Sequence, residues 1–192
     1  LRLSSGYGAW TPVSSSMVMS SGKWYWEVYV ENIGTYSMFG IIPTVREDDT
    51  VNHMNDHYPG TRTDEWGYHG NGSLHNSASG TSSWGATFTT GDIISFALDM
   101  DEGKLNIYKN GSATGSQITG ISATNKSSGS RGEYRANIAP WGTSARTVIN
   151  FGQDGTFAGN KTSQGNTDAS GLGDFYYSAP AGYKALCSKN LP

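Results

Sequence analysis

Residues 84–111 constrain the fold more than any other stretch, because they have the order of a β-hairpin bounded by turn residues. An apolar run at 93–98 is followed by an acidic turn at 99–103 and a second run at 105–108, and Asn110-Gly111 closes the unit. Apolar runs joined by a short turn, with Asn-Gly at a reversal, are typical of antiparallel hairpins. The chain is therefore expected to contain at least one antiparallel sheet.

The remaining sequence also reads as short strands separated by turns. Residues 24–30 alternate, so that Trp24, Trp26, Val28 and Val30 are expected to face the core while Tyr25, Glu27 and Tyr29 lie on the other face. Further strands are expected at 37–42, 66–69, 73–76, 135–140, 147–151 and 183–187. No stretch keeps helical spacing without a Gly or Pro, and charged residues make up only 15% of the chain, against about 25% in typical proteins. We predict an all-β sandwich or barrel.

Bulk composition limits the classes of partner. A length of 192 residues suits one large β domain over 1–192, and the absence of a starting Met suggests a module excised from a longer chain. The net charge of −3, with no basic run, argues against a nucleic-acid partner. No apolar stretch is long enough for membrane insertion. The single cysteine, Cys187, is expected to be a buried, inert thiol in the closing strand.

Four motifs in order resemble one known family. Gly22-Lys23-Trp24-Tyr25-Trp26-Glu27-Val28 is similar to the opening strand of SPRY domains, and Phe39-Gly40-Ile41-Ile42 to the strand that follows it. The 91–111 hairpin and Asn150-Phe151-Gly152-Gln153 resemble two later elements of that family. The resemblance implies a twisted, two-sheet antiparallel β-sandwich of the concanavalin-like jelly-roll type. It also implies binding through loops along one rim, no enzymatic activity and no cofactor.

The closing segment narrows the resemblance. Pro180-Ala181-Gly182-Tyr183-Lys184-Ala185-Leu186-Cys187 is similar to the end of SPRY modules in large bacteriophage and environmental viral proteins. This implies a structural or adhesion module on a virion surface, in a tail fibre or spike, that is extracellular and binds a host-surface glycan or protein or neighbouring virion proteins. A homo-oligomer is possible. A cellular SPRY module that recognises a peptide, and a secreted carbohydrate-binding accessory domain, stay open as alternatives.

Three polar stretches, 43–65, 112–134 and 152–174, are expected to be the long loops that carry binding. Most aromatic residues lie in expected strands and should pack the sandwich, whereas Tyr36, Tyr58 and Trp141 sit in or beside turns. The predicted contact residues offer stacking or hydrogen-bonding side chains in these loops and turns: Tyr36, His53, His57, Tyr58 and Arg62.

Metal and catalytic sites are not expected. His53 and His57 lie near Asp56 and the acids at 47–49, but no cysteine accompanies them, and a solvated polar loop explains the pattern better. The acids at 99–103 lack the rest of a calcium-loop pattern. The acids cluster in expected turns, so no pair of carboxylates is expected on one strand face, and the sequence contains no Gly-x-Ser-x-Gly elbow. We therefore predict a binding protein that is not an enzyme.

Overall fold

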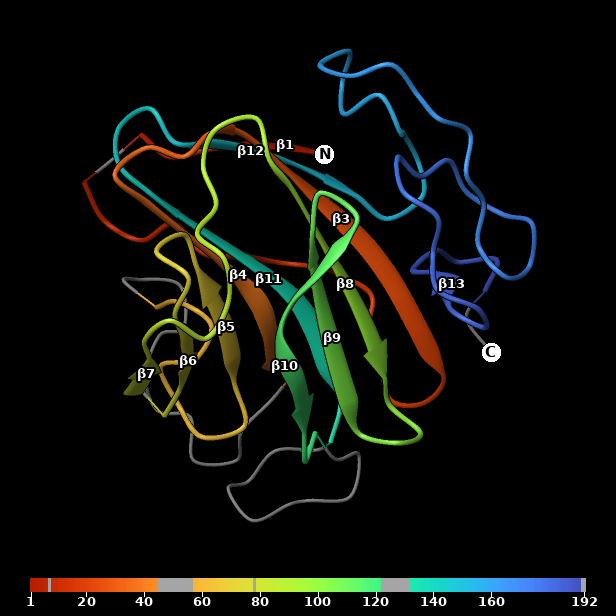
Figure 1. Cartoon of the computed structure of the whole chain (residues 1–192), viewed down its shortest axis with the longest axis horizontal. Helices are drawn as coiled ribbons and strands as arrows, with labels where there is room; N and C mark the ends of the chain where they lie inside the picture. Colours follow the sequence, from red (N-terminus) through yellow and green to blue (C-terminus); the bar gives the residue numbers. More distant parts are fainter. Residues whose placement is uncertain (7, 45–56, 78, 122–131, 191–192) are drawn as a thin grey trace.

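The computed structural model describes residues 1–6, 8–44, 57–77, 79–121 and 132–190, and every regular element in these ranges is a β-strand (Figure 1). Sheet A contains, in spatial order, β1 (Arg2–Ser4), β12 (Arg146–Asn150), β3 (Lys23–Asn32), β8 (Ile93–Asp99), β9 (Lys104–Lys109) and β10 (Ser112–Thr119), and β13 (Lys184–Ala185) pairs in parallel with β3. Sheet B contains β2 (Val13–Ser14), β11 (Tyr134–Trp141), β4 (Tyr36–Pro43), β5 (Trp66–His69), β6 (Leu74–Asn76) and β7 (Ser79–Thr81). All pairs other than β13–β3 are antiparallel, which confirms the predicted β-sandwich.

The main core lies between the two sheets. Trp26 of β3 stacks on Phe96 of β8 with ring centroids 5.2 Å apart, and Phe39 of β4 stacks on Phe88. The inward face of β3 has the composition that the alternation predicts, since Trp24, Trp26, Val28 and Val30 are all buried in this core. Burying these large apolar side chains supplies the main driving force for bringing the sheets together.

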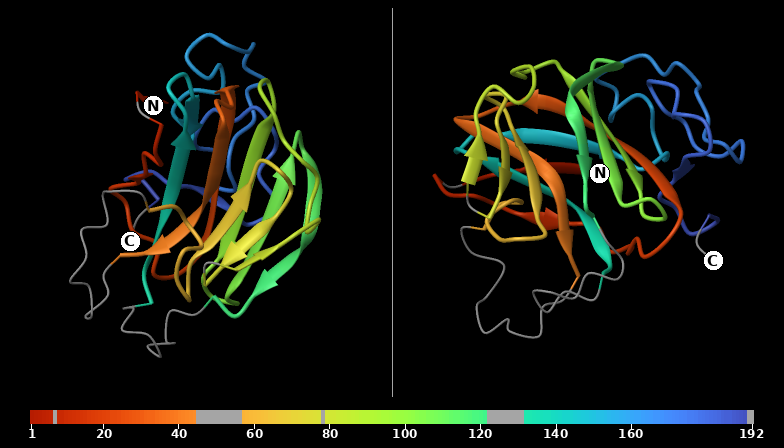
Figure 2. Two further views of the ribbon diagram at one scale, coloured as in Figure 1. Left: turned by 90° about the vertical axis from the view of Figure 1, so that its left-hand side faces the viewer. Right: turned by 60° about the horizontal axis from the view of Figure 1, so that its bottom comes forward.

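The other face of β3 is also buried, because residues 152–190, here called the C-terminal segment, pack against it. Figures 1 and 2 show this segment, in blue, beside the β3 side of the sandwich. Phe175 of the segment contacts Tyr25 of β3 with ring centroids 5.0 Å apart, and Phe157 packs near Tyr29. Glu27, between these two tyrosines, has no exposed surface. The central part of sheet A around β3 is therefore covered on both faces.

A buried carboxylate also holds the C-terminal segment on β3. Glu27 accepts backbone hydrogen bonds from Tyr176 and Tyr177 at 3.0 and 2.8 Å, and side-chain bonds from Tyr25 and Asn150. Burial is the largest influence on the pKa of Glu27 and raises it, and the four donors only partly offset this effect. The buried carboxylate of Glu27 thus adds hydrogen bonds to the apolar contacts that fix the C-terminal segment on β3.

Most of the predicted strands are present, but β1, β2 and β7 were not predicted and a loop was predicted where β10 lies. The strand expected at 183–187 is limited to Lys184–Ala185, so Cys187 lies beyond it and is half-buried instead of buried. The predicted strands near 37–42, 66–69, 93–98, 105–108 and 135–140 correspond to β4, β5, β8, β9 and β11. The polar stretch 112–134, by contrast, was predicted to be a loop, but Ser112–Thr119 forms β10 at the edge of sheet A. Most β10 side chains are exposed, and the pairing with β9 shifts between Thr114 and Ile118, so polar residues suit this edge position. No helix in the described part of the chain is long and apolar enough to span a membrane.

Candidate functional site

The outer face of sheet B carries a group of aromatic and histidine side chains, which is here called the aromatic patch. The strand register places these residues on one face, since Trp141 of β11 pairs with Tyr36 of β4, Met38 pairs with His69, and Gly67 pairs with His75. Their inward-facing neighbours, such as Phe39 and Tyr68, belong to the core. Two further rings from outside these strands complete the patch. Its members are Trp10, Tyr36, Tyr58, His69, His75 and Trp141.

Ring contacts connect all six side chains. Trp10 lies 5.0 Å from Tyr58 and packs edge-on against Trp141 at 5.2 Å. Tyr36 lies 5.3 Å from His69 and 6.4 Å from Trp141. Edge-to-face and tilted arrangements at these centroid distances are the favoured geometries of aromatic pairs. The patch is therefore a set of mutually supported rings on a sheet, not a group of mobile loop side chains.

The stretch 57–62 crosses the outer face of sheet B and brings Tyr58 to the patch. A Cβ on Gly67 would lie 1.9 Å from the carbonyl oxygen of Pro59, so the close approach of this stretch requires glycine at position 67. The stretch is anchored by His57, which is buried and whose Nε2 lies 3.1 Å from each carboxylate oxygen of Glu65. Tyr58 is half-buried and also contacts the His75 ring edge-on at 5.9 Å.

The two patch histidines are biased towards the neutral form. Burial, and then the proximity of His75, lower the pKa of His69, whose Nδ1 accepts a hydrogen bond from the backbone of Asn71 at 3.0 Å. Burial also lowers the pKa of His75, whose Nε2 lies 3.1 Å from the Ser73 hydroxyl. Neutral imidazoles present flat, polar-edged rings without charge, so the patch favours stacking and neutral hydrogen bonding at neutral pH.

Tyr36 is the exposed member of the patch. It retains 48% of its surface, and among the described residues only Leu1 is a more exposed large hydrophobic side chain. The rings of His69 and Trp141 contact it directly, and Trp10, Tyr58 and His75 pack against these two or against one another. An exposed ring held by neighbours presents contact area with little further loss of side-chain freedom on binding.

The predicted contact residues do not all lie in the aromatic patch. Tyr36 and Tyr58 lie in the patch, and so does Trp141, which the sequence also singled out for exposure. His57 is only 8% exposed and bonds to Glu65 inside the domain. Arg62 is half-buried, with its backbone nitrogen 3.2 Å from Glu65 Oε2, and His53 lies outside the described residues. Contact with a ligand stays a prediction for all five.

Sequence reasoning missed Trp10, His69 and His75. The segment around Trp10 has no strand alternation, and only pairing with β11 brings it to the patch, through a bridge to Trp141 and a bond from the Thr11 amide to the Pro140 carbonyl. His69 and His75 lie in predicted strands, where their alternation could have placed them on the outer face. A sequence gives no sign, however, that the outer faces of these strands share a cluster.

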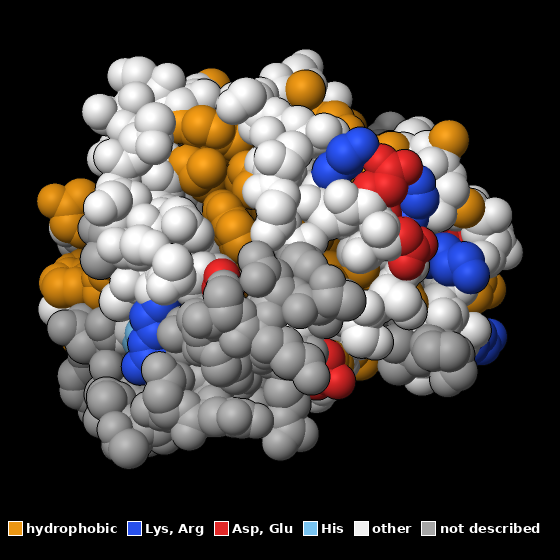
Figure 3. All heavy atoms as spheres, turned by 90° about the horizontal axis from the view of Figure 1, so that it is seen from below, with side chains coloured by type: hydrophobic (Ala, Val, Ile, Leu, Met, Phe, Trp, Pro, Cys, Tyr) orange, Lys and Arg blue, Asp and Glu red, His pale blue; other side chains and the backbone are white. Residues whose placement is uncertain are grey.

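Within the described ranges, no group of three or more His, Cys, Asp or Glu side chains has the arrangement of a metal site. Figure 3 shows acidic and basic side chains interspersed on the right of the face seen from below, next to residues that are not described. Among the charged side chains of the described residues, Lys104 pairs with Glu102, and Lys23 pairs with Asp99 at 2.9 Å. Aromatic stacking and hydrogen bonding are thus the chemistry that the patch itself offers.

Comparison with known proteins identifies the family of the domain. The sequence model of the SPRY domain matches residues 23–154, which is more than half of the chain. The chain belongs to the SPRY domain family. The crystal structure of the SPRY domain of human HERC1 resembles it with a TM-score of 0.58, at 20% sequence identity, over 77% of this chain and 86% of that chain. A comparison with curated proteins finds no match.

At 20% identity the HERC1 structure supports the fold alone, whereas the family match supports the general role. SPRY domains are protein–protein interaction modules. In this SPRY domain, Trp10 and most of the C-terminal segment lie outside the matched residues.

Proposed function

We propose that this SPRY domain is a non-enzymatic adhesion module of a virion that binds a host-surface glycan on the aromatic patch. The observation that carries the proposal is the exposed Tyr36 ring, which lies 5.3 Å from the ring of His69 and 6.4 Å from that of Trp141 on a sheet face. Flat rings with polar edges suit a ligand that has both apolar faces and hydroxyl groups, as a sugar ring has. The likeness of residues 180–187 to the end of viral SPRY modules supports the virion setting.

The rigidity of the platform supports adhesion by many weak contacts. Tyr36 opens β4 and Trp141 ends β11, and the two residues pair directly in sheet B. A site built on paired strands keeps its geometry without ordering on binding. A small patch of this kind binds weakly by itself, and many copies on one particle would raise the overall avidity.

A protein ligand is the second candidate, and membership of the SPRY family favours it. In that case the same patch would contact a peptide or a neighbouring virion protein, with Tyr36 as the central aromatic contact. Aromatic residues are enriched in such interfaces because they supply large buried area with few rotatable bonds. The two candidates share the patch and differ in the partner.

A glycan array with the full chain tests the first candidate. We expect binding to a defined set of glycans that Tyr36→Ala weakens by about tenfold or more and that Tyr36→Phe largely retains, because the phenylalanine keeps the stacking ring. Leu1→Ala, which truncates another exposed hydrophobic side chain, serves as the control and should bind like the parent. Glycan binding that survives Tyr36→Ala unchanged would contradict the assignment of the patch.

A chain that binds no glycan but captures a protein of the source particle in a Tyr36-dependent manner would favour the second candidate. Cryo-electron microscopy of that particle tests the setting separately. Density for this domain at an exposed tip or protrusion supports adhesion, density wedged between subunits supports a structural role, and absence from any particle contradicts the virion setting.

A further inference from the structure

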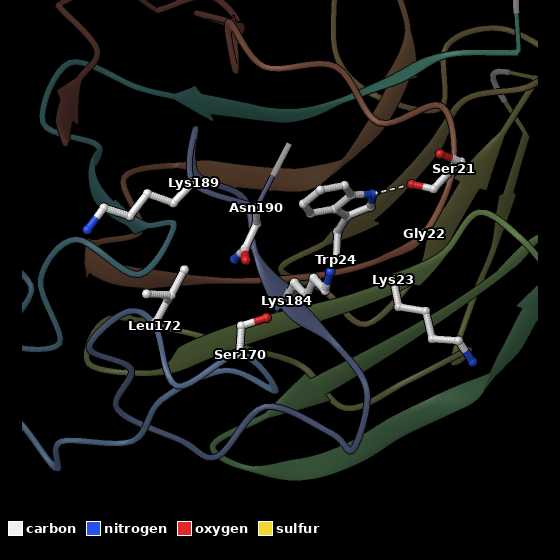
Figure 4. A pocket seen from close by; sticks show the side chains of 9 residues that line it. All are labelled: Ser21, Gly22, Lys23, Trp24, Ser170, Leu172, Lys184, Lys189 and Asn190. Atoms are coloured by element: carbon white, nitrogen blue, oxygen red, sulfur yellow. Dashed lines mark hydrogen bonds between the residues drawn. The ribbon is translucent and has the colours of Figure 1, made fainter. Parts of the chain in front are cut away.

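A second candidate site lies on the other side of the molecule, where the C-terminal segment meets the beginning of β3. A cavity of about 530 Å³ opens there, within the range of roughly 300–1,000 Å³ that is usual for small-molecule sites. One wall is formed by residues 21–24, and the other by residues of the C-terminal segment (Figure 4). The lining residues are Ser21, Gly22, Lys23, Trp24, Ser170, Leu172, Lys184, Lys189 and Asn190.

Three lysines line this cavity, which is here called the lysine pocket. The parallel pairing of β13 with β3 places Lys184 beside Trp24, next to Lys23 in the sequence. In Figure 4 the Lys184 side chain lies in the middle of the opening, whereas Lys23 and Lys189 extend towards opposite sides. Three cations are thus grouped in a chain whose net charge is −3.

Two of the three lysines differ from the other lysines of the described chain. Lys23, Lys104 and Lys109 each pair with an acidic side chain, and Lys161 donates to the backbone of Gly91. Lys184 and Lys189 form no ion pair or hydrogen bond in the described structure and are exposed. Two unpaired ammonium groups at one cavity create a local positive potential that an anion would relieve.

Nearby acids do not neutralise these two cations. Asp99 is engaged by Lys23 at 2.9 Å and by the amides of Asp101 and Glu102. Asp168 is buried behind the pocket, and its carboxylate accepts four hydrogen bonds, including one at 2.6 Å from Asn190. Asp101 Oδ1 accepts from the amide of Gly22 at 2.7 Å. These carboxylates serve turns and the C-terminal segment.

The rest of the lining combines hydroxyl groups with apolar surface. Ser21 and Ser170 are exposed and carry hydroxyl groups. Trp24 is only 5% exposed and donates its indole N–H to the Ser21 carbonyl at 2.7 Å, so it forms a floor and offers no free stacking face. Leu172 supplies a small apolar contact. Such a lining suits a compact ligand that carries hydroxyl groups as well as negative charge.

We propose that the lysine pocket binds an anionic saccharide unit, meaning a sugar that carries a carboxylate or a sulfate. The anionic group would accept a charge-assisted hydrogen bond from the ammonium group of Lys184 in the middle of the opening, and Lys189 at the side would add to the positive potential. The sugar hydroxyls would bond to Ser21 and Ser170. This site is separate from the aromatic patch, and its occupancy does not depend on the function proposed for Tyr36.

The experiment is a titration of the ¹⁵N-labelled full chain by NMR with three matched probes, which are D-glucuronic acid, D-glucose 6-sulfate and uncharged D-glucose. We expect shifts at residues of the lysine pocket with one or both anionic sugars, and binding at least about tenfold weaker for glucose. The carboxylate and sulfate arms identify which anion the pocket prefers. Raising the salt concentration should weaken binding of the charged probes.

A double variant, Lys184→Gln/Lys189→Gln, should reduce the affinity for the anionic probe by about tenfold or more. The matched control is Lys109→Gln/Lys161→Gln, which makes the same change in net charge at the other end of sheet A, near Gly91 and Asp92. Thermal melting verifies that both variants fold. The proposal is overturned if neither anionic sugar shifts pocket residues, if glucose binds equally well, or if the two double variants lose affinity to the same extent.

Discussion

Replacing Glu27 with glutamine should destabilise the domain strongly although it changes only one atom. The two carboxylate oxygens accept four hydrogen bonds, from the Tyr25 hydroxyl, the Asn150 amide and the backbone amides of Tyr176 and Tyr177. A glutamine turns one oxygen into an NH2 donor, which would face two donors that then lack an acceptor. Each buried group left unsatisfied costs about 1–3 kcal/mol, so we expect a loss of about 2–5 kcal/mol.

Thermal or urea denaturation measures this loss. For a domain of this size, 1 kcal/mol corresponds to roughly 2–4 °C, so the expected fall in Tm is about 5–15 °C. Glu102→Gln, at an exposed residue of the hairpin turn, removes the same charge and should change stability by less than about 0.5 kcal/mol. A Glu27→Gln variant as stable as the Glu102→Gln control would refute the role of Glu27 as the anchor of the C-terminal segment.

The pH dependence tests the electrostatics of the same residue. Burial raises the folded-state pKa of Glu27 above its ordinary value of 4.5, so the folded state binds this proton more tightly than the unfolded state does. The linked stabilisation is fully present below the unfolded pKa and is lost as pH rises through the folded pKa. The stability difference between parent and Glu27→Gln should therefore widen as pH falls from 8 towards 4. A difference that narrows instead would mean that the four donors outweigh burial.

Three further changes test other parts of the structure. Tyr25→Phe removes one donor to Glu27 and should cost about 1 kcal/mol in urea denaturation, with the fold intact. Burial favours a higher pKa for Asp168, but its four hydrogen bonds lower this pKa below 3.8. Asp168→Asn should therefore destabilise the C-terminal segment at pH 7, and the effect should disappear as pH falls through the lowered pKa. Hydrogen exchange of residues 168–190 measures this destabilisation, and unchanged protection at pH 7 would contradict the role of Asp168 in holding the segment. Gly67→Ala should lower the free energy of unfolding by at least about 2 kcal/mol, because the added Cβ meets the Pro59 carbonyl. Gly8→Ala, whose added Cβ would have no atom within 4 Å, should leave the melting temperature unchanged. Equal melting temperatures of the two variants would refute the close approach of Pro59 to Gly67.

The architecture could be predicted from the amino-acid sequence, since alternation and turn chemistry are local signals. Residues 24–30 alternate between large apolar residues and the set Tyr25, Glu27 and Tyr29, and this alternation correctly assigned the face of β3 that lies between the sheets. The 93–108 hairpin likewise follows from its turn residues, and Asp99 caps that turn by accepting two backbone amides. The likeness to SPRY motifs added the family, which the family match confirmed.

The segments that cover the outer faces of the sheets could not be predicted in this way. Glu27 reads as a solvent-facing strand residue, yet it is fully buried because a segment about 150 residues later in the chain packs over it. Trp10 likewise joins Tyr58 and Trp141 through pairing that no local pattern encodes. Alternation specifies which residues share a face, but contacts between distant segments depend on how the whole chain packs, and this packing is what creates both the aromatic patch and the lysine pocket.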